Sequence, residues 1–187
     1  PSSLRHVLDS DAFWALTALA LLRRRPLRLI SVWHPSFLDL LLEAAARQWP
    51  LLLDAIASGE CPWIDALPPE ARAGWRVAPD ARRSRERRHI GTDDWSAWWP
   101  SLQVISCWGE QGAEPGWRAL VRRLPHVLVQ PKGLLATEGV VTIPLGSVHA
   151  WAVTSHFVEF LDAHGDVRLA HQRERGVQYE VSITNGG

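Results

Sequence analysis

The chain has 187 residues, of which 47% are hydrophobic and 21% charged, and its formal net charge is zero. This length and apolar fraction predict a folded domain with a sizeable core. Zero net charge argues against a general nucleic-acid binder, which would carry a basic excess. The longest uncharged apolar run, residues 12–22, is too short to span a bilayer. We therefore expect neither nucleic acid nor a membrane as a partner.

Residues 1–60 are predicted to be mainly helical, because apolar residues recur there at helical spacing. A short strand-like run interrupts the pattern once, and a glycine ends it. The helical stretches are residues 10–25, 37–48 and 51–59, and the strand-like run is residues 27–33.

Residues 60–100 are rich in loops and proline and contain an arginine-dense piece, "DARRSRERRHI". Such a run could be a phosphate or nucleic-acid patch. No aromatic residue interleaves with these arginines, and nearby acids offset their charge. We interpret the run as a solvated face of a helix.

Residues 100–138 have the most regular pattern. A strand-like run at 102–108 is followed by a glycine-bearing turn, a helical stretch at 115–124 and a second strand-like run at 126–130. Strand, helix and strand within about thirty residues form a βαβ unit, which requires a parallel sheet.

After Glu138 the pattern alternates as in antiparallel strands. The alternating runs are residues 140–145, 151–162, 166–174 and 176–184. The expected fold class is therefore α/β: a parallel α/β layer with helices, followed by an antiparallel β part over residues 139–187. We expect residues 1–187 to form a single partial domain.

The chain contains no methionine, not even at position 1, and its last strand-like run leads into glycines. From these features we expect an internal piece of a longer protein, with both natural ends missing. Cys61 and Cys107 have neither CxxC nor Cys/His zinc spacing. Reduced, buried thiols are typical of cytoplasmic proteins, and we expect that localisation.

The segment after the strand at 126–130 is the first candidate site, because ligands bind beyond the carboxyl ends of parallel strands. It holds Lys132, the only lysine of the chain, and the adjacent pair Thr137 and Glu138. A threonine hydroxyl can bind a phosphate oxygen, and a carboxylate can help to hold Mg²⁺. A dipeptide is a weak motif, so the residues alone favour an ordinary surface turn leading into a strand.

The turn between the strand at 102–108 and the following helix is the second candidate. Gly109 and Gly112 would let the backbone approach a ligand, and the N-terminus of a helix favours an anion. The spacing matches neither a dinucleotide fingerprint nor a phosphate loop, so a plain turn is an open alternative. Trp108 or Trp117 could provide a stacking surface. We expect His156, within an alternating run, to be packed and hydrogen-bonded.

Several segments taken together resemble the auxin-responsive (Gretchen Hagen) family of acyl acid–amido synthetases, particularly its bacterial members. They occur in the expected order: "SVWHPSFLDLLLE" (31–43), "WPSLQVISCW" (99–108), "GLLATEGVVTIPL" (133–145), "SHFVEFLD" (155–162) and "YEVSITNGG" (179–187). The family belongs to the adenylate-forming, luciferase-like superfamily. The resemblance spans most of the chain and implies a fragment of the N-terminal domain of an adenylate-forming enzyme.

The resemblance implies a two-step reaction. A small carboxylic acid attacks the α-phosphate of ATP to give an acyl-AMP intermediate and pyrophosphate, and an amine or amino acid then attacks the activated carbonyl to form an amide. ATP and Mg²⁺ are the implied cofactors, and an acid–amino acid ligase is the implied full-length parent. The family's Ser/Thr-Gly-rich phosphate loop and arginine–glycine–aspartate segment are not in this sequence, so we expect the fragment alone to be inactive.

The resemblance also implies roles for individual residues. Thr137 would contact the α-phosphate, and Glu138 would help to hold Mg²⁺. The residues implied to line the adenine and ribose side are Gly133, Leu134, Leu135 and Ala136, and those implied to line the nucleotide or acyl pocket are Gly109, Gly112 and Ala113.

Two features depart from the family pattern. An aromatic residue that stacks on adenine commonly precedes the Thr–Glu motif, and Leu134 occupies that place here. Lys132 lies in the wrong segment to be the family's C-terminal lysine, so we give it no catalytic role. The alternative function is a non-catalytic ligand- or partner-binding module on the same α/β scaffold. The sequence identifies neither the acid, the amine nor the oligomeric state.

Overall fold

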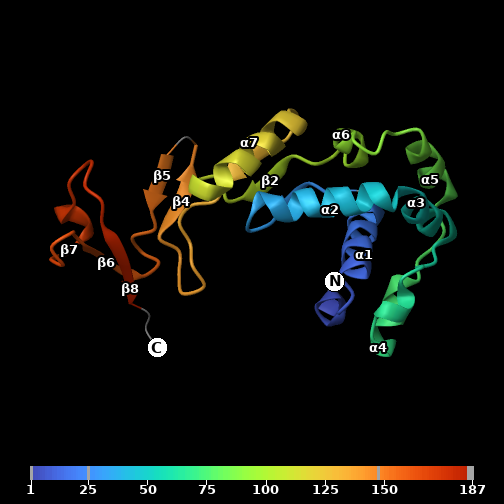
Figure 1. The fold of residues 1–187 in the computed structure, drawn as a ribbon, viewed down its shortest axis with the longest axis horizontal. Coiled ribbons are helices and arrows are strands. Elements are labelled where there is room, and N and C mark those ends of the chain that lie inside the picture. The colour runs from blue at the N-terminus through green and yellow to red at the C-terminus, as the bar shows by residue number, and fades with distance from the viewer. Residues whose placement is uncertain (1, 25, 147, 185–187) are drawn as a thin grey trace. The chain divides into compact units, whose positions relative to one another are not determined.

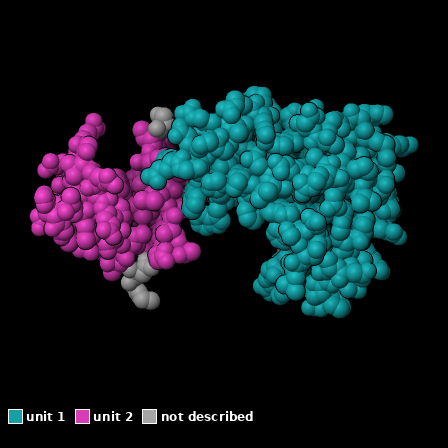
Figure 2. Space-filling model, in the orientation of Figure 1, with its two compact units in different colours: residues 1–129 teal, residues 130–187 magenta. Residues whose placement is uncertain are grey.

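The structure is a computed structural model that describes residues 2–24, 26–146 and 148–184. It divides into two compact units, unit 1 (Pro1–Val129) and unit 2 (Gln130–Gly187), as Figure 2 shows. Each unit is described by itself. The expected fold class is confirmed, because a mixed layer of helices and parallel strands is followed by antiparallel strands.

Helices α1, α2 and α3 build much of unit 1 (Figure 1). The Asp9 side chain starts α1 by accepting a hydrogen bond from the amide of Ala12 at 2.6 Å. Gly59 ends α3 in the left-handed conformation (φ 79°). None of the described helices is long and apolar enough to cross a membrane. The bounds, α1 (Ser10–Arg23), α2 (Pro35–Arg47) and α3 (Trp49–Ser58), lie within two residues of those predicted.

The sheet of unit 1 has the strand order β1-β2-β3. Strands β1 and β2 are parallel, and α7 connects β2 to β3, which confirms the predicted strand–helix–strand order. Ile30 and Ile105 pair across β1 and β2, and both are buried in the core. The elements are β1 (Leu29–Ser31), β2 (Val104–Cys107), α7 (Glu114–Arg123) and β3 (Leu128–Pro131).

The remaining helical elements are short. They are η1 (Ser2–His6), η2 (Ile64–Ala66), α4 (Pro69–Arg72), η3 (Ala73–Trp75), α5 (Ala81–Arg88), α6 (Trp95–Trp98) and η4 (Gln111–Ala113) in unit 1, and η5 (Ala170–Gln172) in unit 2.

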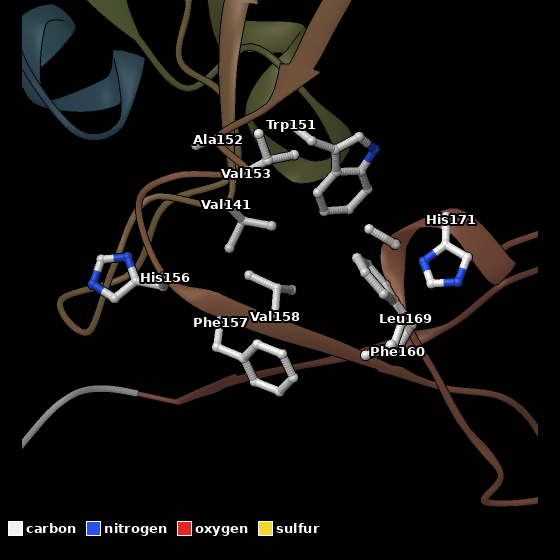
Figure 3. Close-up of a pocket in the computed structure, with 11 residues that line it drawn as sticks. Val141, Trp151, Ala152, Val153, His156, Phe157, Val158, Phe160, Leu169 and His171 are labelled. Atoms are coloured by element: carbon white, nitrogen blue, oxygen red, sulfur yellow. The ribbon is translucent and has the colours of Figure 1, made fainter.

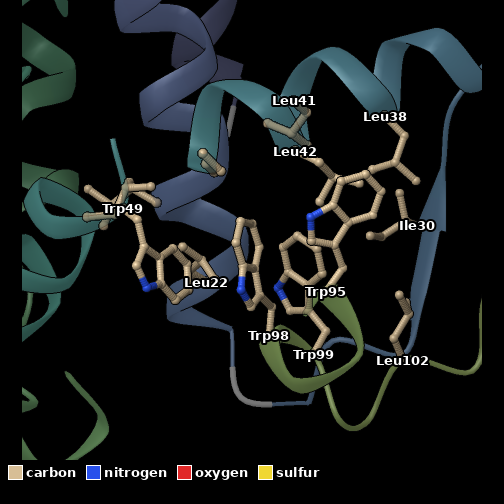
Figure 4. Close-up of a cluster of buried hydrophobic side chains, with 14 of the residues drawn as sticks. Leu22, Ile30, Leu38, Leu41, Leu42, Trp49, Trp95, Trp98, Trp99 and Leu102 are labelled. Carbon is tan, nitrogen blue, oxygen red and sulfur yellow. The ribbon is translucent and has the colours of Figure 1, made fainter. Parts of the chain in front are cut away.

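A tryptophan cluster lies at the centre of the core of unit 1 (Figure 4). Trp98 is fully buried and stacks on Trp49, with ring centroids 4.3 Å apart and planes inclined by 11°. Trp99 meets Trp98 edge to face at 5.8 Å. Leucines of α1 and α2 surround these rings, so the cluster joins α6 to the helical layer.

The interpretation of the arginine run as a solvated helix face is wrong for two of its members. Arg83 and Arg87 of α5 are buried, and the Arg87 guanidinium donates to the carbonyl oxygen of Trp98. Burial, together with the neighbouring positive charge of Arg83, lowers the pKa of Arg87 to about 10. Arg82 is exposed, as predicted. Arg87 therefore attaches α5 to the tryptophan cluster, whereas Arg83 attaches it to the end of α1 by donating to the carbonyl oxygen of Arg24.

Unit 2 contains antiparallel strands, as expected for the part of the chain after Glu138. Strands β4 and β5 pair with each other, and β6 lies between β7 and β8 in a second sheet. The bounds are β4 (Thr142–Leu145), β5 (Val148–Trp151), β6 (Phe157–Leu161), β7 (Val167–Arg168) and β8 (Glu180–Thr184). Residues 185–187, the end of the predicted β part, lie outside the described residues.

The predicted continuous strand over 151–162 is wrong. β5 ends at Trp151, and a turn closed by the Ser155 amide and the Ala152 carbonyl oxygen (2.9 Å) precedes β6. Three polar residues in a row, Thr154, Ser155 and His156, interrupt the apolar pattern at this turn, and the prediction of one continuous strand passed over this break. The break allows β5 and β6 to belong to different sheets.

The Trp98→Ala variant is expected to lower the free energy of unfolding of unit 1 by about 3–5 kcal/mol, because it removes a fully buried ring from the core. Urea unfolding followed at amide signals of α2 and α3 measures the loss. Trp33 is 54% exposed, so the control Trp33→Ala should cost less than about 1 kcal/mol. Equal losses in the two variants would contradict the proposed core.

Candidate functional site

Thr137 and Glu138 form the tip of a tight hairpin in unit 2. Ala136 and Gly139 exchange both backbone hydrogen bonds, at 3.0 and 3.3 Å, and so enclose the Thr–Glu pair in a two-residue turn. Leu135 pairs with Val140, and the amides of Val141 and Thr142 both donate to the carbonyl oxygen of Leu134. The predicted turn is thus an ordered hairpin over residues 134–142, and both tip side chains are exposed.

The base of the hairpin leaves room only for glycine at position 133. A side chain on Gly133 would collide with the backbone carbonyl of Thr142. The hydroxyl of Thr142, a buried residue, accepts a hydrogen bond from the amide of Leu134 at 2.7 Å. This close approach and this hydrogen bond together fix where the two arms of the hairpin meet.

The Glu138 carboxylate is held by its neighbour. The Thr137 hydroxyl donates to it, and this hydrogen bond, with one from the amide of Glu138 itself, lowers the pKa of Glu138 below its ordinary value. The carboxylate is therefore charged at neutral pH and faces solvent. A charged, accessible oxygen donor is what a hard cation requires.

The residues present fit Mg²⁺ only as part of a nucleotide complex. In the part of the chain that the structure describes, no group of three or more His, Cys, Asp or Glu residues could hold a metal ion. Proteins commonly bind Mg²⁺ through one or two carboxylates, with phosphate oxygens and water completing the shell. Glu138 supplies one carboxylate, so it could hold Mg²⁺ together with a bound phosphate.

The neighbours of the Thr–Glu pair differ in exposure. Leu134 is 53% exposed, so its side chain is accessible to a ligand although it replaces the expected aromatic ring. Ala136 is also exposed, and Leu135 is half-buried. Lys132 is half-buried and already takes part in an interaction.

The second candidate turn lies in unit 1, at the carboxyl end of β2. Gln111 has a positive φ of 49°, and the space beside Gly112 is open, whereas Ala113 is buried. The turn leads directly into α7. Gly109, Gly112 and Ala113 therefore share a segment with the N-terminus of a helix, in a different unit from the hairpin.

Trp33 and Trp108 lie at the same edge of the sheet of unit 1. Each follows the carboxyl end of a parallel strand, and their rings meet edge to face with centroids 5.6 Å apart. Both are partly exposed, at 54% and 39%. Trp117 instead donates its indole N–H to the carbonyl oxygen of Val129 at 2.9 Å, which marks it as a structural residue.

An apolar pocket in unit 2 was not predicted from the sequence. It has a volume of about 210 Å³, and Figure 3 shows Val141, Val158 and Leu169 between two histidines at its ends. The aromatic side chains in its lining are Trp151, Phe157 and Phe160, and the histidines are His156 and His171.

His156 is packed and hydrogen-bonded, as predicted. It is half-buried, and its Nδ1 lies 2.7 Å from the hydroxyl oxygen of Ser155. Its ring also packs on Gly139, where a Cβ atom would lie 2.7 Å from the imidazole. His156 therefore lies between the Thr–Glu hairpin and the pocket, a position that its place in a strand pattern could not predict.

The comparison with solved structures shows that this chain is similar in fold to acyl acid amido synthetases. No protein-family model matches the sequence, and no curated protein matches it either.

Two solved structures are similar in fold to this chain. The first, "GH3.15 acyl acid amido synthetase", has a TM-score of 0.78 and 16% sequence identity over 98% of this chain. The second, "AtGH3.15 acyl acid amido synthetase in complex with 2,4-DB", has a TM-score of 0.79 and 16% identity over 94% of this chain. The chain spans only 36% and 34% of these two structures, about a third of their length.

The Gly133→Ala variant is expected to destabilise the hairpin by about 1–3 kcal/mol, because the new methyl group would collide with backbone that has no room to move. Hydrogen exchange at the amides of Val141 and Thr142 measures the loss. Gly112→Ala is the matched control: the space beside Gly112 is open, so its effect should stay within about 0.5 kcal/mol. Unchanged exchange in Gly133→Ala would contradict the close approach.

The Thr137→Val variant should raise the pKa of Glu138 toward its ordinary value, because it removes the hydroxyl that stabilises the carboxylate. The folded pKa is the lowered one, so the stabilising interaction is present above the ordinary glutamate pKa and is lost as pH falls through the folded value. An NMR titration of the Glu138 side chain measures the shift. Ser155→Ala should leave this titration unchanged, and an unchanged midpoint in Thr137→Val would exclude the hydrogen bond.

Proposed function

We propose that this chain is part of a longer, cytoplasmic ATP-dependent enzyme of the auxin-responsive acyl acid–amido synthetase family, of the bacterial type. The enzyme joins a carboxylic acid to an amine or amino acid through an acyl-AMP intermediate. The carrying observation is that Thr137 and Glu138 form an exposed hairpin tip after β3, in a chain with the amido synthetase fold. Since the chain spans about a third of the matched structures, the whole activity is proposed for the longer protein.

In this proposal Thr137 and Glu138 act on the phosphates of ATP as catalytic residues. Glu138 would hold Mg²⁺, and the ion would supply positive charge that stabilises the phosphates of ATP. The Thr137 hydroxyl donates to Glu138 in the structure. A hydroxyl has a single proton to donate, so Thr137 would donate either to Glu138 or to an α-phosphate oxygen of bound ATP.

The segment that leads into the tip binds the nucleoside part of ATP. Gly133 to Ala136 line the adenine and ribose side, where the exposed Leu134 contacts the base by apolar packing in place of aromatic stacking. The turn with Gly109, Gly112 and Ala113 lines the nucleotide or acyl pocket, and the open space beside Gly112 supports a close approach of the backbone.

Leu134 also favours a second candidate function, a non-catalytic ligand- or partner-binding module on the same scaffold. A leucine at the adenine position lacks the π-face that the family pattern provides there. Such a module would bind a ligand without turning ATP over. Acid-dependent exchange of pyrophosphate into ATP therefore separates the enzyme from the module.

The Glu138→Gln variant of the longer protein is expected to lower acid-dependent ATP–pyrophosphate exchange by about 10- to 100-fold, because it removes the charge that holds the metal. Raising the Mg²⁺ concentration should restore part of the rate. Glu180→Gln, at an exposed position of β8, is the matched control and should leave the rate unchanged. Exchange that survives in Glu138→Gln would remove Glu138 from the metal site, and no exchange by the unaltered protein with any acid would contradict the proposed function.

A further inference from the structure

The hydrogen bonds that close the candidate hairpin over residues 134–142 shape it but do not orient it. At the base, the Leu134 amide donates to the Thr142 hydroxyl, and at the tip Ala136 pairs with Gly139. Each of these hydrogen bonds joins one arm of the hairpin to the other. The direction in which the tip points within unit 2 therefore depends on contacts from outside the hairpin.

The turn between β5 and β6 supplies two such contacts. Near the base of the hairpin, the Ala152 amide donates to the carbonyl oxygen of Val141 at 2.9 Å. Beside the tip, the imidazole of His156 packs on Gly139. The turn itself is closed by the Ser155 amide and the Ala152 carbonyl oxygen, also at 2.9 Å. One hydrogen-bonded turn thus contacts the hairpin at two points.

The contact between His156 and Gly139 is close enough to fix a position. A Cβ atom on Gly139 would lie 2.7 Å from both Cε1 and Nδ1 of the imidazole and 3.0 Å from its Cγ. These three ring atoms are its nearest neighbours, so the ring lies directly against the backbone of the glycine. Carbon atoms pack best at about 3.5–4.0 Å, so an approach this close requires glycine at position 139.

The imidazole of His156 is itself held in place. Its Nδ1 lies 2.7 Å from the hydroxyl oxygen of Ser155, and the residue is half-buried. Figure 3 shows the ring turned away from the apolar side chains of the pocket. A ring whose orientation is fixed by its own contacts can hold the backbone that it touches.

We propose that His156 is a positioning residue, whose ring sets where the Thr137–Glu138 tip lies within unit 2. Gly139 follows Glu138 directly, so a displacement of Gly139 also displaces the carboxylate. Metal ligands depend on supporting contacts of this kind for their orientation. The placement of the carboxylate for Mg²⁺ rests on the proposed function, whereas the contact between His156 and Gly139 does not.

NMR of the 187-residue chain tests the contact without ATP. A nuclear Overhauser effect is expected between the ring proton on Cε1 of His156 and an α-proton of Gly139, because the two groups touch. His156→Ala should move the amide signals of Thr137 and Glu138, while those of β7 keep their positions and show that unit 2 is folded. Absence of the Overhauser effect, or unmoved Thr137 and Glu138 signals in the variant, would overturn the proposal.

Gly139→Ala tests the same contact from the other side. Alone, it should move the tip signals, because its methyl group would collide with the imidazole. In the His156→Ala background the methyl group has lost its three nearest neighbours, so its effect should be much smaller. Strongly non-additive shifts are therefore expected. Additive shifts would show that residues 139 and 156 act independently and would contradict the positioning role.

In the longer protein, mispositioning and plain destabilisation have different consequences. His156→Ala should raise the Mg²⁺ concentration needed for half-maximal ATP–pyrophosphate exchange by about tenfold, with the rate at saturating Mg²⁺ largely kept. A lower maximal rate with an unchanged Mg²⁺ requirement is the result of destabilisation alone and would contradict the positioning role. His164→Ala, in the exposed turn between β6 and β7, is the matched control and should change neither quantity.

The positioning role and the proposed function fail separately. If the unaltered longer protein exchanges pyrophosphate and His156→Ala keeps its Mg²⁺ requirement, the positioning role is contradicted and the proposed function is not. If the unaltered protein shows no exchange with any acid, the proposed function is contradicted. The NMR signals of the tip then decide by themselves whether His156 orients it.

Discussion

The hydrogen bond from the Leu134 amide to the Thr142 hydroxyl, beside a glycine that admits no side chain, is the constraint on which the candidate site depends. It closes the base of the hairpin, and the paired backbone of Ala136 and Gly139 closes its tip. These two closures place Thr137 and Glu138 at the tip of the hairpin, where both side chains are exposed. A hydroxyl and a carboxylate presented in this way can meet a phosphate and a cation without a preformed cluster of acids.

The sequence predicted the layers of the fold better than the details of unit 2. Helical spacing was sufficient to predict α1 to α3, and the strand–helix–strand pattern was sufficient to predict β2, α7 and β3. Such a pattern of apolar residues lies within a single element and reflects the burial of one of its faces. The break between β5 and β6 was missed although three polar residues in a row, 154–156, interrupt the apolar pattern there, because a short polar stretch can also lie within an exposed strand. Arg83 and Arg87 were assigned to the surface because their hydrogen-bond acceptors, the carbonyl oxygens of Arg24 and Trp98, lie outside the arginine run. The sequence of the run itself does not indicate these acceptors.

The candidate site could be predicted only where its residues are neighbours in the chain. Thr137 and Glu138 are neighbours in the chain, so a short motif can indicate them. The pocket is lined by residues from Val141 to His171, which belong to separate strands and a turn, and no spacing rule connects them. His156 could be predicted to be packed, but its contact with Gly139 follows from how the hairpin and β6 are arranged.

The central claim is that the Thr137–Glu138 tip holds the metal and phosphates of ATP, and paramagnetic broadening tests it most directly. Mn²⁺ replaces Mg²⁺ in the presence of ATP, and the amide signals of the longer protein are recorded. The account predicts that the signals of Thr137, Glu138 and Gly139 broaden strongly and that Glu138→Gln abolishes the effect. Sharp signals from these residues while Mn²⁺ and ATP are bound would contradict it.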